Sequence, residues 1–411
     1  MTTSRSLRQI MATTDVHSAL GADGLLLSRL HQSRADSLLV DCGDFFEGTG
    51  YYRLGQGSLE KEILLGLYDV IAPGNHGWLH HFEPALHRRT VCANTVDAVN
   101  GNPLFRRLRI VEVAGRRTAV TGVIGLQAFD SIPVGQRSGH RATDPVQALR
   151  ELMLAHHHEV DSWVLLSHSG FEEDLKLAEA CPFLDVIFAG HCHSEHAGPA
   201  RVGNTVVVKG RELAVGYAIA EPASDGWVGR TAHFPDSAGA ASSELPPELA
   251  SLRDRMAAVD AQLAEPLGRI AKPYRNHQLD RRALLQDVAD RLRSGLGREA
   301  VVLNETTART TLLGEVLTTG DLLAIEPFAN TLVEARVAPA HRHDPGALVA
   351  HLTERVGPLV TSPDPLPAGL TSVLTTDYLA DSCLGGRAST HPAGLGLGSA
   401  IRSMLTNGDD Q

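Results

Sequence analysis

The sequence predicts an α/β protein with two domains, and three observations support this. The chain has 411 residues, more than a single hydrophobic core usually organises. Between residues 7 and 235, short apolar runs alternate with segments of helical periodicity, which is typical of sheets covered by helices. A stretch rich in Ser, Ala, Gly and Pro follows at 236–247. We therefore predict a first domain at 1–235, a linker with a connecting helix at 236–267, and a second domain at 268–411.

Apolar runs in the first domain predict buried strands. These runs lie at 7–14, 37–41, 69–72, 163–166, 185–188 and 205–208. The segment 107–125 predicts a hairpin with Gly115 at its turn. Helices between the runs are then expected to cover the sheets.

The region after the linker predicts one long helix and a smaller α+β domain. An apolar stripe at steps of three and four residues predicts a helix over 247–264. We interpret it as a connecting helix packed on a domain, in preference to a partner-binding coil. The second domain is expected to hold a helix near 281–293 and strands at 299–304, 331–337 and 371–376. The Gly-rich tail after Gly394 is expected to be loose.

Composition limits the functional classes. The 37 basic and 48 acidic residues give a net charge of −11, which argues against a nucleic-acid polymer as partner. No run of 18 apolar residues occurs, so no membrane span is expected. The N-terminus lacks a signal-like apolar region, and we expect a cytoplasmic protein. The five cysteines include no CxxC pair, which argues against a disulfide framework or a thiolate zinc site. The sequence gives no indication of an oligomeric state.

Two acidic motifs follow predicted strands. In Asp15-Val16-His17, residues two apart would point the same way in an extended chain, so the carboxylate and the imidazole could bind one cation. Asp44 lies just beyond a buried strand, where ligands collect, and one carboxylate can bridge two cations. Gly43 allows the backbone to turn close to the site. Asp41 is interpreted as a supporting or turn residue.

Three further motifs each follow an apolar run. They are Gly74-Asn75-His76, a lone His168, and Gly190-His191-Cys192-His193. Asn75 offers a neutral oxygen, while His76 beside it could face a substrate. Cys192 is interpreted as a packing residue. Alone, Gly74-Asn75-His76 is more typical of a turn and His168 of a capping or buried residue, whereas Gly190-His191-Cys192-His193 is moderately specific for a metal site. Together they form a set of Asp, His and Asn ligands without thiolate, which suits a pair of divalent transition metals.

In order and spacing, the five motifs resemble those of the calcineurin-like metallophosphoesterases, and in particular the 5′-nucleotidase branch. Segments that resemble this branch lie at 91–95, 284–290, 304–309, 320–330 and 376–386. The resemblance implies a four-layer α/β/β/α first domain and an α+β substrate-binding domain. It also implies two divalent ions, of Mn, Zn, Fe, Co or Mg. One ion would take Asp15, His17, Asp44 and His193, and the other Asp44, Asn75, His168 and His191.

The resemblance also implies roles for individual residues in catalysis and substrate binding. His76 would be the catalytic histidine beside Asn75. Asn304 and Arg309 would approach a nucleotide whose base lies between Phe328 and Tyr378. Arg281 or Arg282 would help to hold phosphate.

The sequence departs from the family pattern at some of these positions. The acidic residue expected after Gly-Asn-His and the Asp expected three after the histidine are here Gly77 and Leu79, and Glu83 is a candidate replacement. Arg387 stands where a carboxylate of the family usually contacts the sugar, which predicts an altered or more anionic substrate.

We therefore expect an enzyme that hydrolyses the phosphate monoester of a nucleotide or a nucleotide-like metabolite by attack of metal-bound hydroxide. The alternatives are a phosphodiesterase or pyrophosphatase acting on cyclic nucleotides or nucleotide sugars, and a non-catalytic binding protein on the same fold.

Overall fold

The computed structural model describes residues 5–21, 24–234, 245–384 and 386–406. The chain forms two compact units. The first unit contains the described residues up to Glu47 and the segment Leu54–Val259, and the second contains Gly48–Arg53 and the described residues from Asp260 onward. The division therefore falls within helix α8 (Pro247–Leu263). Most of the stretch at 236–247 that is rich in Ser, Ala, Gly and Pro lies outside the described residues, at 236–244.

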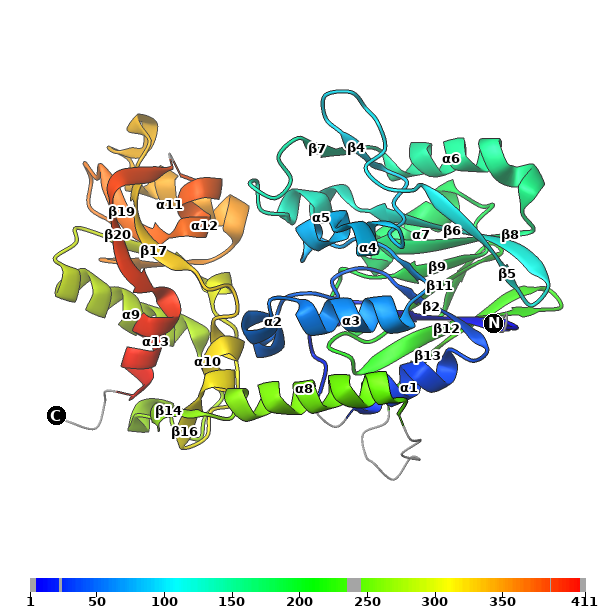
Figure 1. Ribbon diagram of the computed structural model, residues 1–411. Coiled ribbons are helices and arrows are strands. Elements are labelled where there is room, and N and C mark those ends of the chain that lie inside the picture. Colours follow the sequence, from blue (N-terminus) through cyan, green and yellow to red (C-terminus); the bar gives the residue numbers. More distant parts are fainter. Residues whose placement is uncertain (1–4, 22–23, 235–244, 385, 407–411) are drawn as a thin grey trace. The chain divides into compact units, whose positions relative to one another are not determined.

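Two sheets form the centre of the first unit (Figure 1). One has the order β13-β12-β1-β2-β3, with bounds Gly226–His233, Gly216–Ala223, Gln9–Thr13, Ser37–Asp41 and Val70–Ile71. The other has the order β10-β11-β9-β8-β6-β5, with bounds Ala200–Val202, Thr205–Lys209, Val186–Ala189, Ser162–His168, Arg116–Ile124 and Leu108–Val113. Strands β1, β2 and β3 are parallel to one another, as are β6, β8, β9 and β11. Within each set, the carboxyl ends of the strands therefore lie at one edge of the sheet.

The sheets pack face to face, and helices cover their outer faces. Side chains such as Ile10 and Val40 from one sheet and Val164 and Phe188 from the other form the core between them. The helices α6 (Pro145–His156) and α7 (Phe171–Ala180) pack on the outer face of the six-stranded sheet. On the other side, α1 (Leu25–Ser33) packs on β2, and α3 (Ser58–Leu67) packs beside α1. The predicted four-layer α/β/β/α fold is confirmed.

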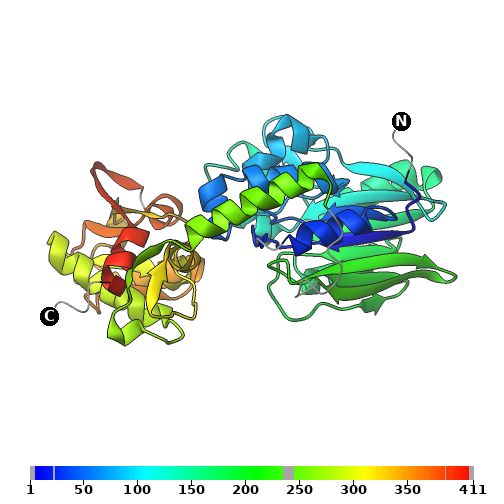
Figure 2. The same cartoon turned by 60° about the horizontal axis from the view of Figure 1, so that its bottom comes forward.

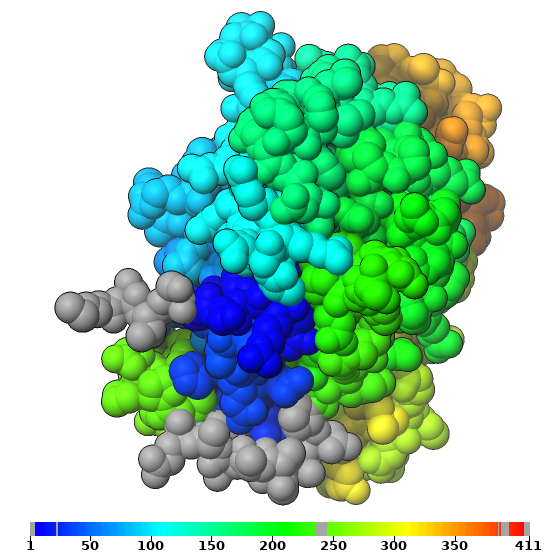
Figure 3. Space-filling view, turned by 90° about the vertical axis from the view of Figure 1, so that its right-hand side faces the viewer, coloured from blue at the N-terminus to red at the C-terminus, as the bar shows by residue number. Residues whose placement is uncertain are grey.

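Short elements complete the first unit and its boundary. Those of the first unit are η1 (Trp78–Phe82), α4 (Pro84–His87), β4 (Thr95–Asp97), α5 (Leu126–Ser131), β7 (His140–Ala142) and η2 (His157–Glu159). Helix α2 (Gly50–Gly55) lies at the boundary, with its residues up to Arg53 in the second unit. Helix α8 runs beside α3 (Figures 1 and 2), where Arg255 Nη1 lies 2.6 Å from Glu62 Oε1. The N-terminal segment lies against the turn of the β5–β6 hairpin (blue and cyan in Figure 3), and Ala114 N donates to Leu7 O at 2.7 Å.

The second unit is a five-stranded sheet with helices on both faces. The sheet order is β18-β15-β19-β17-β20, with bounds Leu359–Ser362, Val301–Asn304, Ser372–Thr376, Thr331–Arg336 and Arg387–Gly396. Val301 and Leu303 pack with α9 (Arg281–Leu296) and α13 (Leu397–Thr406) on one face. Val302 packs with α11 (Pro345–Val356) and α12 (Asp377–Ser382) on the other face, because successive strand residues point to opposite sides.

The remaining elements of the second unit are short. They are β14 (Pro266–Arg269), η3 (Lys272–Tyr274), η4 (Glu305–Thr307), β16 (Val316–Thr318), α10 (Thr319–Ile325) and η5 (Pro339–His341). In the described part of the chain, no helix has both the length and the apolar surface needed to cross a bilayer.

The expectation of a loose C-terminal tail is wrong for the residues that the structure describes. Residues 397–406 form α13, whose Leu397, Ile401 and Leu405 are buried against α9. Their four-residue spacing places all three on one helix face. This packing outweighs the helix-weakening effect of Gly398.

Candidate metal centre

All seven predicted metal ligands lie at or just beyond the carboxyl ends of parallel strands in the first unit. Parallel strands bring such ends to one edge of a sheet. Asp15 and His17 follow β1, Asp44 follows β2, Asn75 follows β3, His168 ends β8, and His191 and His193 follow β9. The two sheets therefore both contribute ligands.

The turns after β1 and β2 are held together by backbone hydrogen bonds. Asp15 N donates to Gly43 O at 3.0 Å, and His17 N donates to Asp44 O at 2.9 Å. Asp15, His17 and Asp44 have φ values of 49°, 50° and 56°. The expectation of an extended chain over Asp15 and His17 is therefore wrong, although their ligand atoms still converge. Both are in the left-handed region, which costs roughly 1–2 kcal/mol per non-glycine residue.

Two glycines allow these turns to approach each other. A Cβ on Gly74 would lie 2.0 Å from Asp44 Oδ1, and a Cβ on Gly43 would lie 2.7 Å from His168 Nδ1. Gly43 also has a φ of 100°. Side chains at either position would therefore displace predicted ligands.

Five of the seven predicted ligands form one cluster of nitrogen and oxygen atoms together with His76. Ligand atoms within 4.8 Å of one another define three groups. The groups are Asp15 with His17 and His193, Asp15 with Asp44 and His168, and His17 with Asp44 and His76. Because Asp15, His17 and Asp44 each belong to two groups, the three groups form a continuous site.

His168 shows how the cluster is oriented. Its Nδ1 lies 2.8 Å from Cys42 O, a contact that requires a proton on Nδ1. Its Nε2 then faces Asn75 Oδ1 at 3.1 Å and Asp44 Oδ2 at 3.3 Å. Burial lowers the pKa of His168, but the Asp44 and Asp15 carboxylates and the Cys42 carbonyl together raise it to about 9. The Nε2 of His168 and the two oxygens that face it therefore require a positive charge between them.

Asp44 is the acidic centre of the cluster. Burial raises the pKa of its carboxyl group, but His168 and His76 lower it more, so the net shift is well below the usual range. Asp44 Oδ1 also accepts a hydrogen bond from His76 N at 2.8 Å. The carboxylate is therefore ionised and fixed in orientation.

The remaining histidines approach the cluster from the turn after β9. His193 Nε2 lies 3.3 Å from His17 Nε2, and His193 Nδ1 lies 2.5 Å from Glu212 Oε2. The ring of His191 lies 5.1 Å from that of His168, and its backbone N donates to the Asp15 carboxylate at 3.1 Å. A carboxylate on the second nitrogen of a metal-binding histidine fixes its tautomer.

The donor set fits divalent cations. The Nε2 atoms of two histidines approach each other, and the Nε2 of a third faces two oxygen acceptors, an arrangement that a shared cation stabilises. Carboxylate, imidazole and amide donors without thiolate suit Mn, Fe, Co, Zn or Mg. Five of the seven predicted ligands thus belong to these groups, and Asn75 Oδ1 lies next to His168.

Several supporting residues lay outside the sequence prediction. Lys209 is buried, and its Nζ donates to the carbonyls of Cys192 at 2.7 Å and Ser194 at 2.6 Å, on either side of His193. Ser167 Oγ donates to the buried Asp174 carboxylate at 2.5 Å, next to His168. No local pattern marks these residues, because they act through tertiary contacts.

The contacts of Asp41 agree with a supporting or turn residue, and those of Cys192 agree with a packing residue. Asp41 Oδ1 accepts from Gly43 N at 3.0 Å, and Asp41 Oδ2 accepts from Thr13 Oγ1 at 2.6 Å. Burial raises the pKa of Asp41 to about 8. Cys192 Sγ lies 3.2 Å from the backbone N of Phe171.

His76 pairs with a carboxylate that the sequence did not indicate. Its Nδ1 lies 3.0 Å from Glu47 Oε2. The predicted replacement, Glu83, instead contacts His80 Nδ1 at 2.7 Å and Lys61 Nζ at 3.2 Å. The choice of Glu83 is therefore wrong, because Glu83 is held by its own neighbours.

Four predicted substrate-binding residues lie around one edge of the second unit's sheet. Asn304 ends β15, and Tyr378 follows the end of its parallel neighbour β19. Phe328 precedes β17, which runs antiparallel to β19. The guanidinium carbon of Arg309 lies 5.5 Å from the centre of the Phe328 ring. Phe328 and Tyr378 are 44% and 42% exposed, so both rings are accessible within this unit.

The other predicted basic residues are engaged in ion pairs. Arg387 Nη2 lies 2.6 Å from Asp381 Oδ2 and 3.8 Å from Asp377 Oδ2. Its charge is thus compensated, which weakens the reason to expect a more anionic substrate. Arg282 pairs closely with Glu305, and Arg281 Nε lies 3.9 Å from the same carboxylate. Gly385, beside Arg387, lies outside the described residues.

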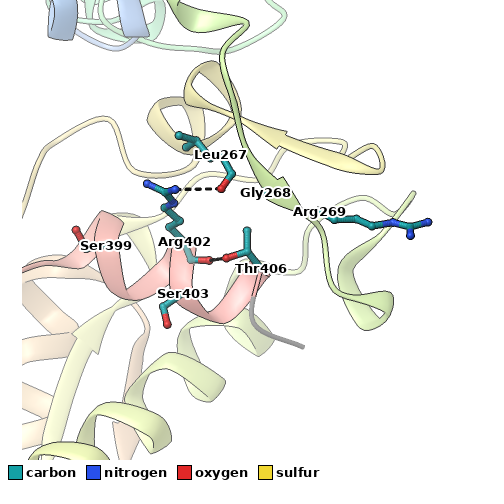
Figure 4. Close-up of a pocket in the computed structure, with 7 residues that line it drawn as sticks. All are labelled: Leu267, Gly268, Arg269, Ser399, Arg402, Ser403 and Thr406. Atoms are coloured by element: carbon teal, nitrogen blue, oxygen red, sulfur yellow. Dashed lines mark hydrogen bonds between the residues drawn. The ribbon is translucent and has the colours of Figure 1, made fainter. Parts of the chain in front are cut away.

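A groove elsewhere in the second unit contains none of the predicted site residues (Figure 4). It is lined by Leu267, Gly268, Arg269, Ser399, Arg402, Ser403 and Thr406. Arg402 Nη2 donates to Leu267 O at 3.0 Å, and Arg269 points away from the groove. The groove therefore lacks a convergent set of polar groups, and the metal centre remains the candidate site.

Comparison with known sequences identifies the domain that carries this cluster. The sequence pattern of the calcineurin-like phosphoesterase family matches residues 8–195. This part of the chain is a calcineurin-like metallophosphoesterase domain. The domain includes all seven predicted ligands, and members of the family use divalent metal ions.

Curated relatives match the same part of the chain. The chain is 28% identical over 204 residues to the "Probable 5'-nucleotidase" of Treponema pallidum (strain Nichols), covering 46% of this chain and 34% of that protein. It is 27% identical over 182 residues to the "Apyrase" of Tabanus yao, covering 41% and 32%. The matches thus span about a third of the length of these relatives.

A solved structure extends the similarity of fold to the second unit. The 5'-nucleotidase precursor from Thermus thermophilus superposes with a TM-score of 0.71 at 18% sequence identity. The superposition covers 97% of this chain and 96% of that one. The arrangement of a metallophosphoesterase domain followed by an α+β domain is therefore shared.

Proposed function

We propose that the chain is a divalent-metal-dependent phosphomonoesterase that acts on a nucleotide or a nucleotide-like metabolite. The observation that carries this proposal is the convergence of Asp15, His17, Asp44, His168 and His193 in one cluster. The metallophosphoesterase domain supports a hydrolytic reaction at phosphorus. Relatives named 5'-nucleotidase support the substrate class.

The cluster would hold two divalent ions, with Asp44 contributing to both. Such ions polarise phosphoryl oxygens and lower the pKa of bound water. The identity of the metal lies among Mn, Zn, Fe, Co and Mg.

The chain's own residues would bind and orient the reactants. His76 is held beside Asp44 through its backbone N–H, and its Nδ1 faces Glu47. We assign to its Nε2 the protonation of the leaving oxygen or the stabilisation of charge on it, a role worth roughly 10²–10⁴-fold in rate. In the second unit, the exposed rings of Phe328 and Tyr378 and the cation of Arg309 support a substrate with a planar base.

Phosphate release from a substrate panel tests the proposal. The panel contains AMP, glycerol phosphate, a cyclic nucleotide, a nucleotide sugar and bis-p-nitrophenyl phosphate, each with added Mn²⁺. We expect AMP to be hydrolysed fastest, and Asp44→Asn to lose at least about 10³-fold in rate because it removes the charge shared by the ions. Faster turnover of the diesters or of the nucleotide sugar would favour the phosphodiesterase or pyrophosphatase alternative. No turnover by metal-loaded protein would favour a binding protein.

A further inference from the structure

We propose that Glu47 is the carboxylate that positions His76 for catalysis. This inference deepens the proposed function and depends on it for the role of His76. The pair brings together two turns separated by 29 residues in sequence, the one after β2 and the one after β3. Glu47 would fix the ring of His76 with the proton on Nδ1, so that Nε2 is the nitrogen that serves the substrate.

Glu47 contacts the His76 segment at two points. Its Oε2 lies 3.0 Å from His76 Nδ1, and its Oε1 accepts from Gly77 N at 3.1 Å. The two oxygens therefore fix both the ring and the backbone that follows it. A carboxylate held in this bidentate manner has little rotational freedom, so it can define one orientation of the histidine.

The backbone around Glu47 indicates that its placement is costly. Glu47 has a φ of 64°, in the left-handed region that a non-glycine residue adopts at a cost of roughly 1–2 kcal/mol. Residues held in this region concentrate at functional sites. Glycine would adopt the same conformation without that cost but would remove the carboxylate.

The same geometry explains why Gly77 carries no acidic side chain. Gly77 has a φ of 66°, and a Cβ there would lie 2.5 Å from the Cβ of Phe46. Phe46 is fully buried and immediately precedes Glu47. Packing of the Phe46 ring against Gly77 thus excludes a side chain at 77 and brings the backbone N–H within reach of Glu47.

The side chain of Glu47 is also accessible enough to act beside a substrate site. The side chains of His76 and Glu47 are 26% and 28% exposed. The ring of His76 packs edge-on against that of His17, with centroids 5.1 Å apart. His76 therefore lies at the border of the metal cluster, where an oriented ring nitrogen can serve the substrate.

The test compares Glu47→Gln with Glu83→Gln as a matched control. Both substitutions remove one charge from a carboxylate that contacts a histidine of the same segment, but Glu83 contacts His80. We expect Glu47→Gln to lower kcat for an alkyl phosphate such as AMP by about 10–100-fold, the range for residues that orient a catalytic or ligating histidine. The fall should be much smaller for p-nitrophenyl phosphate, whose leaving group needs no proton. Glu83→Gln should leave both rates within about 2-fold of the wild type, as expected of a change away from the reacting atoms.

Two further measurements separate positioning from loss of structure. Glu47→Gln should keep the metal content of the wild type and should cause no additional loss of rate in a His76→Ala background. An equal fall for both leaving groups, loss of metal, or an undiminished effect in the His76→Ala background would overturn the inference.

A readout without turnover distinguishes failure of this inference from failure of the proposed function. In Zn²⁺-loaded protein with ¹⁵N-labelled histidine, the His76 signals are assigned by their disappearance in His76→Ala. Neutral His76 should carry its proton on Nδ1 in the wild type and in Glu83→Gln, and should lose that preference in Glu47→Gln. If no substrate is hydrolysed but this pattern holds, the pairing stands and the proposed function fails. If the tautomer is unchanged in Glu47→Gln, the pairing has no orienting effect.

Discussion

A single added methyl group at Gly74 should disable the metal centre while leaving the fold intact. A Cβ at this position would lie 2.0 Å from Asp44 Oδ1 and 2.5 Å from Asp44 N. To reach an ordinary contact of 3.4 Å, Asp44 would have to retreat by about 1.4 Å. Metal–ligand distances tolerate about 0.2 Å. Gly74→Ala should therefore reduce bound metal, and a displacement of about 1 Å is enough to lower kcat by about 10²-fold.

Gly66→Ala provides the matched control for this substitution. Gly66 lies in α3, and a Cβ there would meet nothing within 4 Å. This change should leave metal content and rate unchanged, and it should stabilise the protein by roughly 0.5–1 kcal/mol because alanine favours a helix. Metal per chain by mass spectrometry, kcat and urea unfolding are measured for both variants. If Gly74→Ala retained the wild-type metal content and rate, the close contact between the two turns would be wrong.

Other expected outcomes concern stability. Lys209→Met should destabilise the first unit by roughly 1–3 kcal/mol in urea, because two part-buried carbonyl groups lose their hydrogen-bond donor, at about 0.5–1.5 kcal/mol each. Lys176→Met, at an exposed ion pair, should change the free energy of unfolding little, and equal effects of the two substitutions would contradict this account. Burial lowers the pKa of His81 from 6.5 to about 3, so the unfolded chain binds a proton that the folded chain does not. The contribution of His81 to the free energy of unfolding is therefore fully present above pH 6.5. It falls by about 2 kcal/mol between pH 7 and pH 5, because only the unfolded chain gains the proton in this range. His81→Phe should show a shallower acid dependence in urea unfolding, and an unchanged slope would refute the assignment. Added Mn²⁺ at 100 times its Kd should stabilise the wild type by about 2.7 kcal/mol, and stabilisation of Asp44→Asn to the same extent would contradict the ligand role of Asp44.

The sequence predicted the elements that have a strong local pattern. The runs at 37–41, 163–166 and 205–208 correspond to β2, β8 and β11, and the hairpin turns at Gly115 as expected. The helix predicted over 247–264 is α8. Buried strands and amphipathic helices are detectable because one hydrophobic period extends over several residues.

The sequence did not predict features that depend on tertiary contacts. Asp15 and His17 are oriented by hydrogen bonds to a turn almost 30 residues later, so an extended-chain argument about their spacing fails. Glu47 reaches His76 across the same distance, whereas Glu83 is closer in sequence but is already paired. The apolar residues of α13 recur every four residues in the sequence, which is typical of a helix. The neighbouring glycines led us to expect a loose tail instead.

The predicted metal ligands come from two different sheets, so the candidate centre is sensitive to how the sheets pack. Asp15, Asp44 and Asn75 follow strands of one sheet, whereas His168 ends a strand of the other sheet and His193 follows one. The buried side chains between the sheets, such as Val40 and Val164, therefore fix the spacing of the ligands without touching any ion. Truncation of such a residue should weaken metal binding although the residue does not contact the ions. Metal affinity would therefore report how closely the two sheets pack against each other.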